Sequence, residues 1–413
     1  MSFPPPPVWQ TQLLAYVRRT FPTKAYSQGK ISDTAAMTLA EARFYGKGLR
    51  PLSDHFNGIA PIAASNYFNL KEYRAAYLLY FFAANWAKMT DILQQTARHL
   101  PILPSYRLLD LGSGPGSMSL AAIDGLQNHL KATHAPAATV HLDWVDQSRS
   151  ALADAQGLSR QLFTDQTITS RLLVDRASPR TFLQLGKDPY DLIILGDMLN
   201  ELDMPARFDL VERCLTSKLA PHGSLIVVEP ALQKTARDLQ HLRDRLVKEI
   251  PTTRILAPCL RQGLCPLNHY NRRDWCHFYS AWQRPAWLDM LENTAGLRKD
   301  WLKYAYLVFQ NTAQPRTRPQ PTPHARTTTW RVISNPMKGK GTQELVLCGP
   351  QGRLHLTGHF QNKSLKNGDF FNLRRGDPVA IVPTEWRDLC ERAEGWDYRL
   401  VLTPDHTIAR IDA

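Results

Sequence analysis

The stretch Leu108-Leu109-Asp110-Leu111-Gly112-Ser113-Gly114-Pro115-Gly116 decides the fold of this chain. An apolar run that ends in an acidic residue and closely spaced glycines is typical of a buried strand followed by a sharp turn. Glycine lets the backbone turn tightly and approach a ligand without a Cβ clash. A helix is expected directly afterwards, over Ser117–Leu126, and its free N–H groups would face the turn. The stretch therefore predicts a strand–turn–helix unit that binds a small molecule.

The spacing of the glycines indicates which small molecule. Nucleotide-dependent dehydrogenases carry Gly-x-Gly-x-x-Gly, with the pyrophosphate at the start of the helix. Here the third glycine, Gly116, comes one residue earlier, and Ser117 follows it. The resulting Asp-x-Gly-x-Gly-x-Gly spacing is that of class I methyltransferases, which bind S-adenosylmethionine (SAM). We expect Asp110 to accept a hydrogen bond from the amino group of SAM, directly or through water.

Short apolar runs alternate with helical stretches beyond this loop, which is typical of a parallel sheet covered on both faces. The alternation predicts an α/β fold, a Rossmann-type class I methyltransferase domain over residues 101–310. Its strands are expected at Arg107–Leu111, Val140–Val145, Arg171–Val174, Asp191–Leu195 and Ser224–Val228.

Acidic residues follow several of these runs and add to the expected SAM site. Asp146 ends the second run and is expected to hold the ribose hydroxyls, although a loop over His129–Ala138 places it later than usual. Asp175 ends the third run and could approach the adenine, and Asp197 ends the fourth and faces the expected methyl-transfer site. The predicted SAM-binding residues are Asp110, Gly112, Gly114, Gly116, Asp146, Asp175 and Asp197.

The rest of the chain divides into three further parts. Residues 1–100 predict an N-terminal helical region, because apolar residues recur at helical spacing and no strand-like alternation intervenes. Residues 311–326 are rich in proline and arginine and predict an extended linker. Residues 327–413 carry several β-type runs and predict a small β-rich domain.

Charge and composition narrow the class of partner. The 413-residue chain has a net charge of +13, and residues 251–413 carry 23 Lys and Arg against 14 Asp and Glu. Such an excess suggests a polyanion, most often nucleic acid, although solubility alone could also explain it. No apolar run is long enough to span a membrane, and the N-terminus does not resemble a secretory signal, so we expect a cytoplasmic protein without membrane contact.

Three cysteines, Cys259, Cys265 and Cys276, lie close together in a segment, residues 255–280, without regular periodicity. This arrangement suggests that a metal organises the segment, and thiolates favour zinc or an iron–sulfur cluster. Candidates for a fourth ligand are Cys348, His269 and His277, whereas Cys214 is expected to be a core residue and Cys390 to be in the core or partly exposed. Unrelated buried thiols are the alternative.

No known catalytic motif marks the atom that would be methylated. Pro258-Cys259 is similar to the nucleophilic Pro-Cys of RNA cytosine-5 methyltransferases, but it lies about 30 residues beyond the fifth strand, so we reject Cys259 as a nucleophile. The Asn/Asp-Pro-Pro-Tyr motif of amino-methylating enzymes is absent, since the fourth run ends Gly196-Asp197-Met198-Leu199. The catalytic residue therefore stays unassigned.

With these features the chain resembles the methyltransferase-like proteins of the mitochondrial small ribosomal subunit, a family with bacterial members. The resemblance covers roughly residues 35–385 and its most specific part is the cysteine segment. The matching features are Leu109–Gly116, Asn200-Glu201-Leu202, Cys259, Cys265-Pro266-Leu267, Trp275-Cys276-His277-Phe278 and Cys348.

This resemblance implies a SAM-binding protein that carries a [4Fe–4S] cluster and acts on the small ribosomal subunit or its rRNA. Carried over by position, the cluster ligands are Cys259, Cys265, Cys276 and Cys348, with zinc as the alternative metal. The interval from Cys265 to Cys276 is long for the family, and Leu260–Leu264 lacks an expected histidine.

Two functions follow from the sequence. One is a SAM-dependent methyltransferase with an RNA substrate, and the other is a non-catalytic, ribosome-binding assembly factor that uses SAM and metal structurally. In both, basic side chains would contact phosphates, with a steep dependence on salt. The candidates for that contact are Arg316, Arg318, Arg326, Arg331, Lys338 and Lys340.

Overall fold

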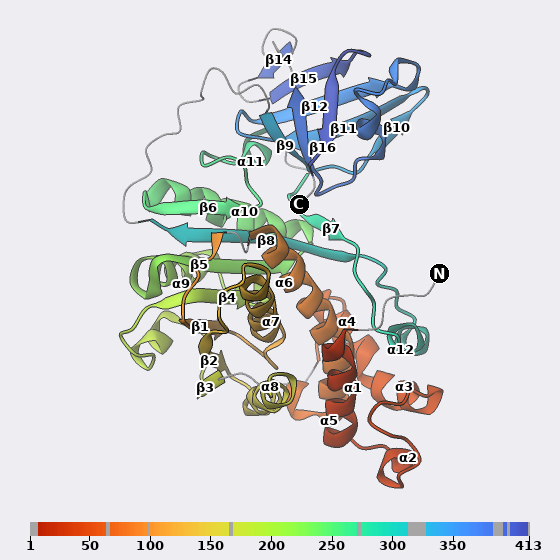
Figure 1. Ribbon diagram of the computed structural model, residues 1–413, viewed down its shortest axis with the longest axis vertical. Helices are drawn as coiled ribbons and strands as arrows, with labels where there is room; N and C mark the ends of the chain where they lie inside the picture. Colours follow the sequence, from red (N-terminus) through yellow and green to blue (C-terminus); the bar gives the residue numbers. More distant parts are fainter. Residues whose placement is uncertain are drawn as a thin grey trace.

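The computed structural model describes residues 7–62, 67–96, 99–164, 168–270, 274–312, 328–382, 391–394 and 397–411. Two 8-stranded sheets organise these residues. Figure 1 shows the first sheet among helices and the second sheet, in blue, beyond the edge that β6 and β7 form.

The first sheet has the strand order β3-β2-β1-β4-β5-β8-β6, with β7 paired to β8. Strands β1 to β5 pair in parallel, whereas β8 runs antiparallel to β5, β6 and β7. The five apolar runs of the sequence are the five parallel strands, so the predicted doubly wound α/β sheet is confirmed. The strands are β1 (Ser105–Leu111), β2 (Thr139–Asp146), β3 (Ile168–Val174), β4 (Tyr190–Gly196), β5 (Leu219–Pro230), β6 (Thr253–Ala257), β7 (Phe278–Ser280) and β8 (Leu302–Asn311).

Helices cover both faces of this sheet, and each face has its own apolar core. Neighbouring residues of a strand point to opposite faces, so Leu108 packs with the N-terminal helices, α7 and α8, whereas Leu109 packs with α9 and α10. The covering helices of the sheet are α7 (Ser117–Ala132), α8 (Arg149–Leu162), α9 (Met204–Arg213) and α10 (Gln233–Glu249).

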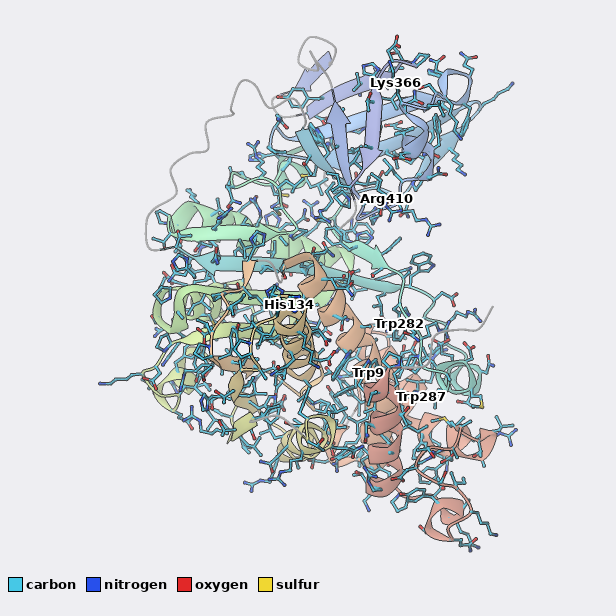
Figure 2. The ribbon with its side chains drawn as sticks, viewed as in Figure 1. Trp9, His134, Trp282, Trp287, Lys366 and Arg410 are labelled. Atoms are coloured by element: carbon cyan, nitrogen blue, oxygen red, sulfur yellow. The ribbon has the colours of Figure 1, made fainter. Side chains whose placement is uncertain are left out.

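The N-terminal helices pack beside α7 and α8 at the end of the sheet where the parallel strands finish (Figure 1). They are α1 (Val8–Thr20), α2 (Lys24–Ser27), α3 (Leu39–Tyr45), α4 (Leu49–Phe56), α5 (Lys71–Ala76) and α6 (Ala83–Thr96). A π-helical turn, Tyr77–Phe82, joins α5 to α6. Trp287, just before α12 (Leu288–Ala295), donates a 2.9 Å hydrogen bond from Nε1 to the carbonyl of Leu79 in that turn, and Trp9 of α1 stacks on Trp86 (Figure 2).

The segment 255–280 contains more regular structure than the sequence indicates. Its ends belong to the sheet, as β6 and β7, and a short helix, α11 (Pro266–Tyr270), lies between them. Both strands pair with β8, which follows them in the chain. Pairing of this kind supplies backbone hydrogen bonds from a distant segment, so short strands form without a periodic apolar pattern of their own.

The second sheet has the order β14-β15-β12-β11-β9-β13-β16, with β10 paired to β11. Its inner face is a separate apolar core that includes Trp330, Leu345, Leu356 and Phe370. The strands are β9 (Thr328–Val332), β10 (Met337–Gly339), β11 (Thr342–Cys348), β12 (Arg353–His359), β13 (Pro378–Val382), β14 (Glu391–Glu394), β15 (Asp397–Leu402) and β16 (Thr407–Arg410). The expected linker, residues 311–326, lies almost wholly outside the described residues.

Polar contacts join the second sheet to the first part of the chain. The Arg331 guanidinium donates from Nη1 to Gln95 Oε1 on α6 at 3.3 Å and to the Gly376 carbonyl at 2.9 Å. Arg261 donates to the Pro350 carbonyl, just after β11, at 2.9 Å. Among the described helices, none combines the length and apolar character that crossing a membrane requires.

Candidate functional site

The turn after β1 has the geometry that its glycines suggest. Gly112, Gly114 and Gly116 have φ values of +70°, +53° and +76°, in the left-handed region that favours glycine. The N–H groups of Gly112 and Ser113 donate to the Val145 carbonyl on β2, at 2.8 and 3.1 Å. The turn is thus held against the end of β2, and Gly116 leads directly into α7.

Side chains at two of these glycines would also collide with their surroundings. A Cβ at Gly112 would come within 2.9 Å of the Met198 Cβ. A Cβ at Gly116 would lie 3.1 Å from the Ala155 Cβ and 3.2 Å from Trp144 Nε1. The close approach of β1, β2 and β4 at this turn therefore requires glycine for space as well as for φ.

Asp110, at the end of β1, has an unused hydrogen-bonding atom. Its side chain is buried, and Oδ2 has no hydrogen-bond partner among the described residues. Burial raises the pKa of this carboxyl group to about 7, while hydrogen bonds from Ser119 oppose the rise. An unpaired buried carboxylate oxygen is costly unless a donor reaches it, so this atom fits the ammonium group of an amino-acid ligand.

Asp146, at the end of β2, lies beside the glycine turn. Its Oδ2 accepts from the Gly114 N–H at 2.8 Å and its Oδ1 from the Ser148 N–H at 2.7 Å. Burial raises the pKa of this carboxyl group. Both oxygens keep further lone pairs, which suits the ribose role expected for this residue. The structure thus brings Asp110, Asp146 and the glycine turn together.

Asp175, after β3, is engaged within its own loop. Its Oδ2 accepts hydrogen bonds from Thr181 Oγ1 at 3.1 Å and from Gln184 Nε2 at 2.9 Å. Its backbone N–H donates to the Asp146 carbonyl at 3.1 Å, which places the loop next to the Asp146 strand end. The carboxylate therefore orders this loop, and its approach to an adenine stays a prediction.

Asp197, directly after β4, adopts a strained backbone conformation. Its φ of +52° is uncommon for a residue other than glycine. Its Oδ2 accepts from Lys88 Nζ on α6 at 3.3 Å, while its buried Oδ1 has no hydrogen-bond partner among the described residues. Residues in uncommon backbone conformations cluster at functional sites. The unpaired Oδ1 of Asp197 is therefore a candidate contact for a ligand.

Aromatic side chains that the sequence analysis did not select lie over the glycine turn. A Cβ built at Gly114 would meet Phe68 at 3.7 Å and the Tyr77 hydroxyl at 3.9 Å. Burial, and then the charges of Asp197, Asp146 and Asp110, raise the pKa of Tyr77, so these acids are among its electrostatic neighbours. The aromatic run Tyr77–Phe82 was visible in the sequence, but its helical period indicated only a buried helix.

The four cysteines assigned by resemblance come from different segments and lie together. Cys259 and Cys265 flank the turn before α11, Cys276 precedes β7, and Cys348 ends β11 of the second sheet. Burial, and then the charges of the other three cysteines, raise the pKa of the Cys276 thiol. Burial, Cys265 and Cys259 raise that of Cys348. Within the described residues, no three or more His, Cys, Asp or Glu side chains are placed to hold a single metal ion.

Polar side chains of α10 lie beside this group of four cysteines. Gln240 Nε2 lies 3.5 Å from Cys265 Sγ, and Asp244 Oδ1 accepts the Cys265 N–H at 2.8 Å. Arg243 is buried, its Nε has no hydrogen-bond partner among the described residues, and its nearest charges include Cys259 and Cys265. Burial raises the pKa of the Cys265 thiol, and the Arg243 charge opposes this rise. The thiolate is the form that binds metal.

The residues expected to contact nucleic acid do not form one described surface. Lys338 and Lys340 lie exposed on and beside β10. Arg331 instead bonds to Gln95 and Gly376, and its guanidinium lies 5.8 Å from the Phe278 ring, so it fastens the two sheets. Arg316, Arg318 and Arg326 lie outside the described residues.

The sheet and its acidic edge define a class of protein. An open parallel sheet with one reversed strand, β8, between β5 and β6 is the arrangement of the class I SAM-dependent methyltransferase fold. The glycine turn and the acids that follow β1, β2 and β4 occupy the carboxyl ends of the strands, where ligands bind in open α/β sheets.

A model of the family described as mitochondrial small ribosomal subunit Rsm22 matches residues 71–377. The match spans well over half of the chain, and the chain belongs to this family. The family resemblance drawn from the sequence is therefore confirmed. No curated protein matches the chain.

Solved structures with similar folds are methyltransferases of low sequence identity. A Listeria monocytogenes protein described as a candidate class I SAM-dependent methyltransferase is 13% identical, with a TM-score of 0.39 over 75% of this chain and 90% of that chain. Magnesium protoporphyrin IX methyltransferase from Synechocystis, with bound SAM, is 12% identical, with a TM-score of 0.32 over 67% and 99%. The N-methyltransferase NodS from Bradyrhizobium japonicum is 14% identical, with a TM-score of 0.32 over 54% and 85%. Because these TM-scores are low, the assignment of the class of fold rests on strand order, loop geometry and the family match.

Proposed function

We propose that this protein is a SAM-dependent, methyltransferase-like factor that acts on the small ribosomal subunit or its rRNA. The observation that carries the SAM assignment is the glycine turn beside the buried, unpaired oxygen of Asp110. Membership of the Rsm22 family supports the ribosomal direction. The positive net charge of +13 supports a polyanionic partner.

The residues of the turn have distinct proposed roles. Asp110 would pair with the ammonium group of SAM, and Asp146 would accept from the ribose hydroxyls. Gly112 and Gly114 leave backbone space for the methionine part of the ligand. Asp197 and Lys88 lie at the end of β4, where the methyl group would be presented to an acceptor. Bound SAM supplies an electrophilic methyl group, and the chain supplies orientation and exclusion of water.

We also propose that Cys259, Cys265, Cys276 and Cys348 hold a [4Fe–4S] cluster. Four thiols within electrostatic range of one another, that of Cys265 buried and the other three partly buried, with the Arg243 guanidinium beside them, support this donor set. Each cysteine of such a cluster binds a different iron, so the sulfur atoms are spaced more widely than around one zinc ion. Because Cys348 belongs to the second sheet, the cluster would tie the two sheets together.

One experiment tests the enzymatic part of the proposal. Purified protein is incubated with tritiated SAM and either small ribosomal subunits or precursor rRNA, and the RNA and protein fractions are counted. Label in RNA, absent from an Asp197→Asn variant, is the expected result. Label only in protein, or transfer to small molecules in the absence of RNA, contradicts the assignment of the substrate.

A non-catalytic assembly factor is the second candidate function. It is favoured by the lack of a known catalytic motif and by the ion pair in which Lys88 occupies one oxygen of Asp197. In that case SAM and subunits bind, but no label is transferred to RNA, subunit protein or the chain itself.

The pKa of Asp110 predicts a pH dependence of SAM binding. The carboxyl group is protonated more readily than usual in the free protein, with a pKa of about 7. A bound ammonium group stabilises its ionised form, so the affinity should rise about tenfold per pH unit below pH 7 and level off above it. Calorimetric titrations from pH 5.5 to pH 8.5 (roughly one and a half units either side) measure this slope.

The variant Asp110→Asn is the control for this pH slope. It keeps the size of the side chain and removes the titrating group, so binding should weaken and lose its dependence on pH between about 5.5 and 7. A wild-type affinity that is flat over this range, or an equal slope in the variant, contradicts the role of Asp110. An equal slope would point to Asp146, whose carboxyl pKa burial also raises.

The proposed phosphate contacts of Lys338 and Lys340 predict how RNA binding depends on salt. If both contact phosphates, replacing them with glutamine should lower the slope of log affinity against log salt by about 0.7–0.9 per lysine. Filter binding to 16S rRNA at several salt concentrations measures the slope. The variant Lys24→Gln/Lys30→Gln removes the same charge from exposed positions on α2 and in the turn after it, and it should leave the slope unchanged. Equal effects of the two double variants would show that only net charge matters.

A further inference from the structure

A continuous row of aromatic rings, which we call the aromatic wall, extends from the glycine turn to the buried ring of Tyr80. It consists of Phe68, Tyr77, Phe81 and Tyr80. Phe68 and Tyr77 lie nearest to Gly114, with ring centroids 4.9 Å apart. The Tyr77 and Phe81 centroids are 5.6 Å apart, and those of Phe81 and Tyr80 are 5.0 Å apart.

The outer end of the wall carries a cation. Lys299 Nζ lies 4.8 Å from the centroid of Tyr80 and 5.4 Å from that of Phe81. Burial, and then the charge of Lys88, lower the pKa of Lys299 to about 8. Lys88 in turn pairs with Asp197. The polar groups near the wall are therefore the Asp197 carboxylate, with its unpaired oxygen, and the ammonium groups of Lys88 and Lys299. The glycine turn lies at its other end.

Two local features indicate that this arrangement is more than core packing. Three of the four rings belong to the π-helical turn Tyr77–Phe82, and such turns occur frequently at functional sites. Tyr77 and Phe81 keep part of their surface accessible although their neighbours Leu78 and Phe82 are fully buried. The strained backbone of Asp197 and its unpaired Oδ1 are the second feature.

The chemistry of these groups fits one kind of ligand. Flat rings stack on nucleobases of any sequence. A carboxylate oxygen accepts from a base N–H, and lysines donate to base carbonyl or ring nitrogen atoms and to phosphates. A base inside a duplex cannot reach such a wall, because its faces are already stacked, so the base must be unstacked or flipped out.

We infer that the aromatic wall, with Asp197, Lys88 and Lys299, is the acceptor site for a single nucleobase that is unstacked from RNA. This inference rests on the proposed function and names its substrate: a base in a single-stranded or distorted segment. Tyr77 and Phe81 stack the base, Asp197 Oδ1 accepts its N–H, and Lys299 contacts the outer carbonyl or phosphate oxygen.

The test uses the full chain and a short single-stranded RNA that carries one central 2-aminopurine. Emission of this base reports stacking, whereas fluorescence anisotropy of a terminal dye reports total RNA binding. S-adenosylhomocysteine is present at saturation so that the cofactor site is filled. We expect the emission to change when the RNA binds, because the base leaves its RNA neighbours and stacks on the wall.

Two variants change the wall, and each has a control elsewhere on the surface. Phe81→Leu removes a stacking ring, and Lys299→Met removes the outer cation. Phe44→Leu and Lys47→Met are the controls, since the Lys47 ammonium lies 6.0 Å from the exposed Phe44 ring in a similar pair outside this site. We expect Phe81→Leu to abolish the emission change and weaken binding about tenfold, and Lys299→Met to weaken it less. The controls should behave as wild type.

The outcomes separate this inference from the proposed function. No anisotropy change with any RNA, including 16S rRNA, contradicts the proposed function and the inference together. Binding without an emission change, or an unaltered change in both Phe81→Leu and Lys299→Met, contradicts only the acceptor site. An emission change seen only without S-adenosylhomocysteine would assign the wall to the adenine of SAM and overturn the inference. Unchanged S-adenosylhomocysteine affinity in both variants shows that they are folded.

Discussion

Replacing Gly114 with arginine is expected to abolish SAM binding, with an affinity loss of at least about 100-fold, or about 2.7 kcal/mol. The φ of Gly114 is +53°, where any other residue is strained by roughly 1–2 kcal/mol. The new side chain would also enter the space between the turn, Phe68 and Tyr77. It would bring a positive charge to a site that must accept the cationic sulfonium and ammonium groups of SAM.

Calorimetric titration with SAM measures this loss, and Gly29→Arg is its control. Gly29 has a φ of +70° and no heavy atom within 4 Å of an added Cβ, so arginine there imposes similar backbone strain without entering the site. We expect Gly29→Arg to bind SAM as the wild type does. If Gly114→Arg also binds within threefold of the wild type (a difference of about 0.7 kcal/mol), the turn is not the SAM site.

Replacing Cys276 with serine is expected to remove the metal and to destabilise the contact between the sheets. Cys276 interacts with all three other proposed ligands, so its loss should open the cluster. Metal that binds only the folded state contributes its binding free energy to stability. A loss of about 2 kcal/mol would lower Tm by roughly 4–8 °C. Anaerobic purification, iron and sulfide analysis, visible absorption and thermal unfolding measure these effects.

Cys214→Ser is the control for the cysteine experiment. Cys214 is fully buried in another part of the molecule, among the residues packed with α9 and α10, so serine there also costs stability but should leave the iron content unchanged. Iron retained in Cys276→Ser contradicts the ligand assignment. If the wild type contains zinc instead of iron, the bound metal is zinc rather than an iron–sulfur cluster. The same cysteine variants then test the ligands of zinc.

Although β3 at the edge is largely exposed, the first sheet could be predicted from the sequence because its central parallel strands, β1, β4 and β5, are buried on both faces. Such strands are continuous apolar runs, and each ends where a loop returns to water, so the runs and the acids Asp110, Asp146 and Asp197 were found together. Strands β6 and β7 were missed because Thr253–Ala257 and Phe278–Ser280 are short and depend on β8 for pairing.

The roles of individual charged side chains could not be predicted from the sequence as well as the strands could. Arg331 lies in a basic stretch that suggested phosphate contact, but the strand register turns its side chain toward Gln95 of α6. No local sequence pattern distinguishes the segments that contain Lys88 and Lys299. They meet Asp197 and the aromatic wall only because α6 and the start of β8 pack at the same end of the sheet.

The sequence by itself determined the class of fold, the glycine turn and the family. Those features are local: a glycine spacing, apolar runs of the right length and a cysteine segment all lie within short stretches of chain. The tertiary structure alone decided that Asp110 has an unpaired oxygen, that Cys348 joins cysteines far from it in the chain, and that aromatic rings lie beside the glycine turn. These properties depend on long-range packing and on burial, which removes water as a hydrogen-bond partner, and neither is encoded in any one segment.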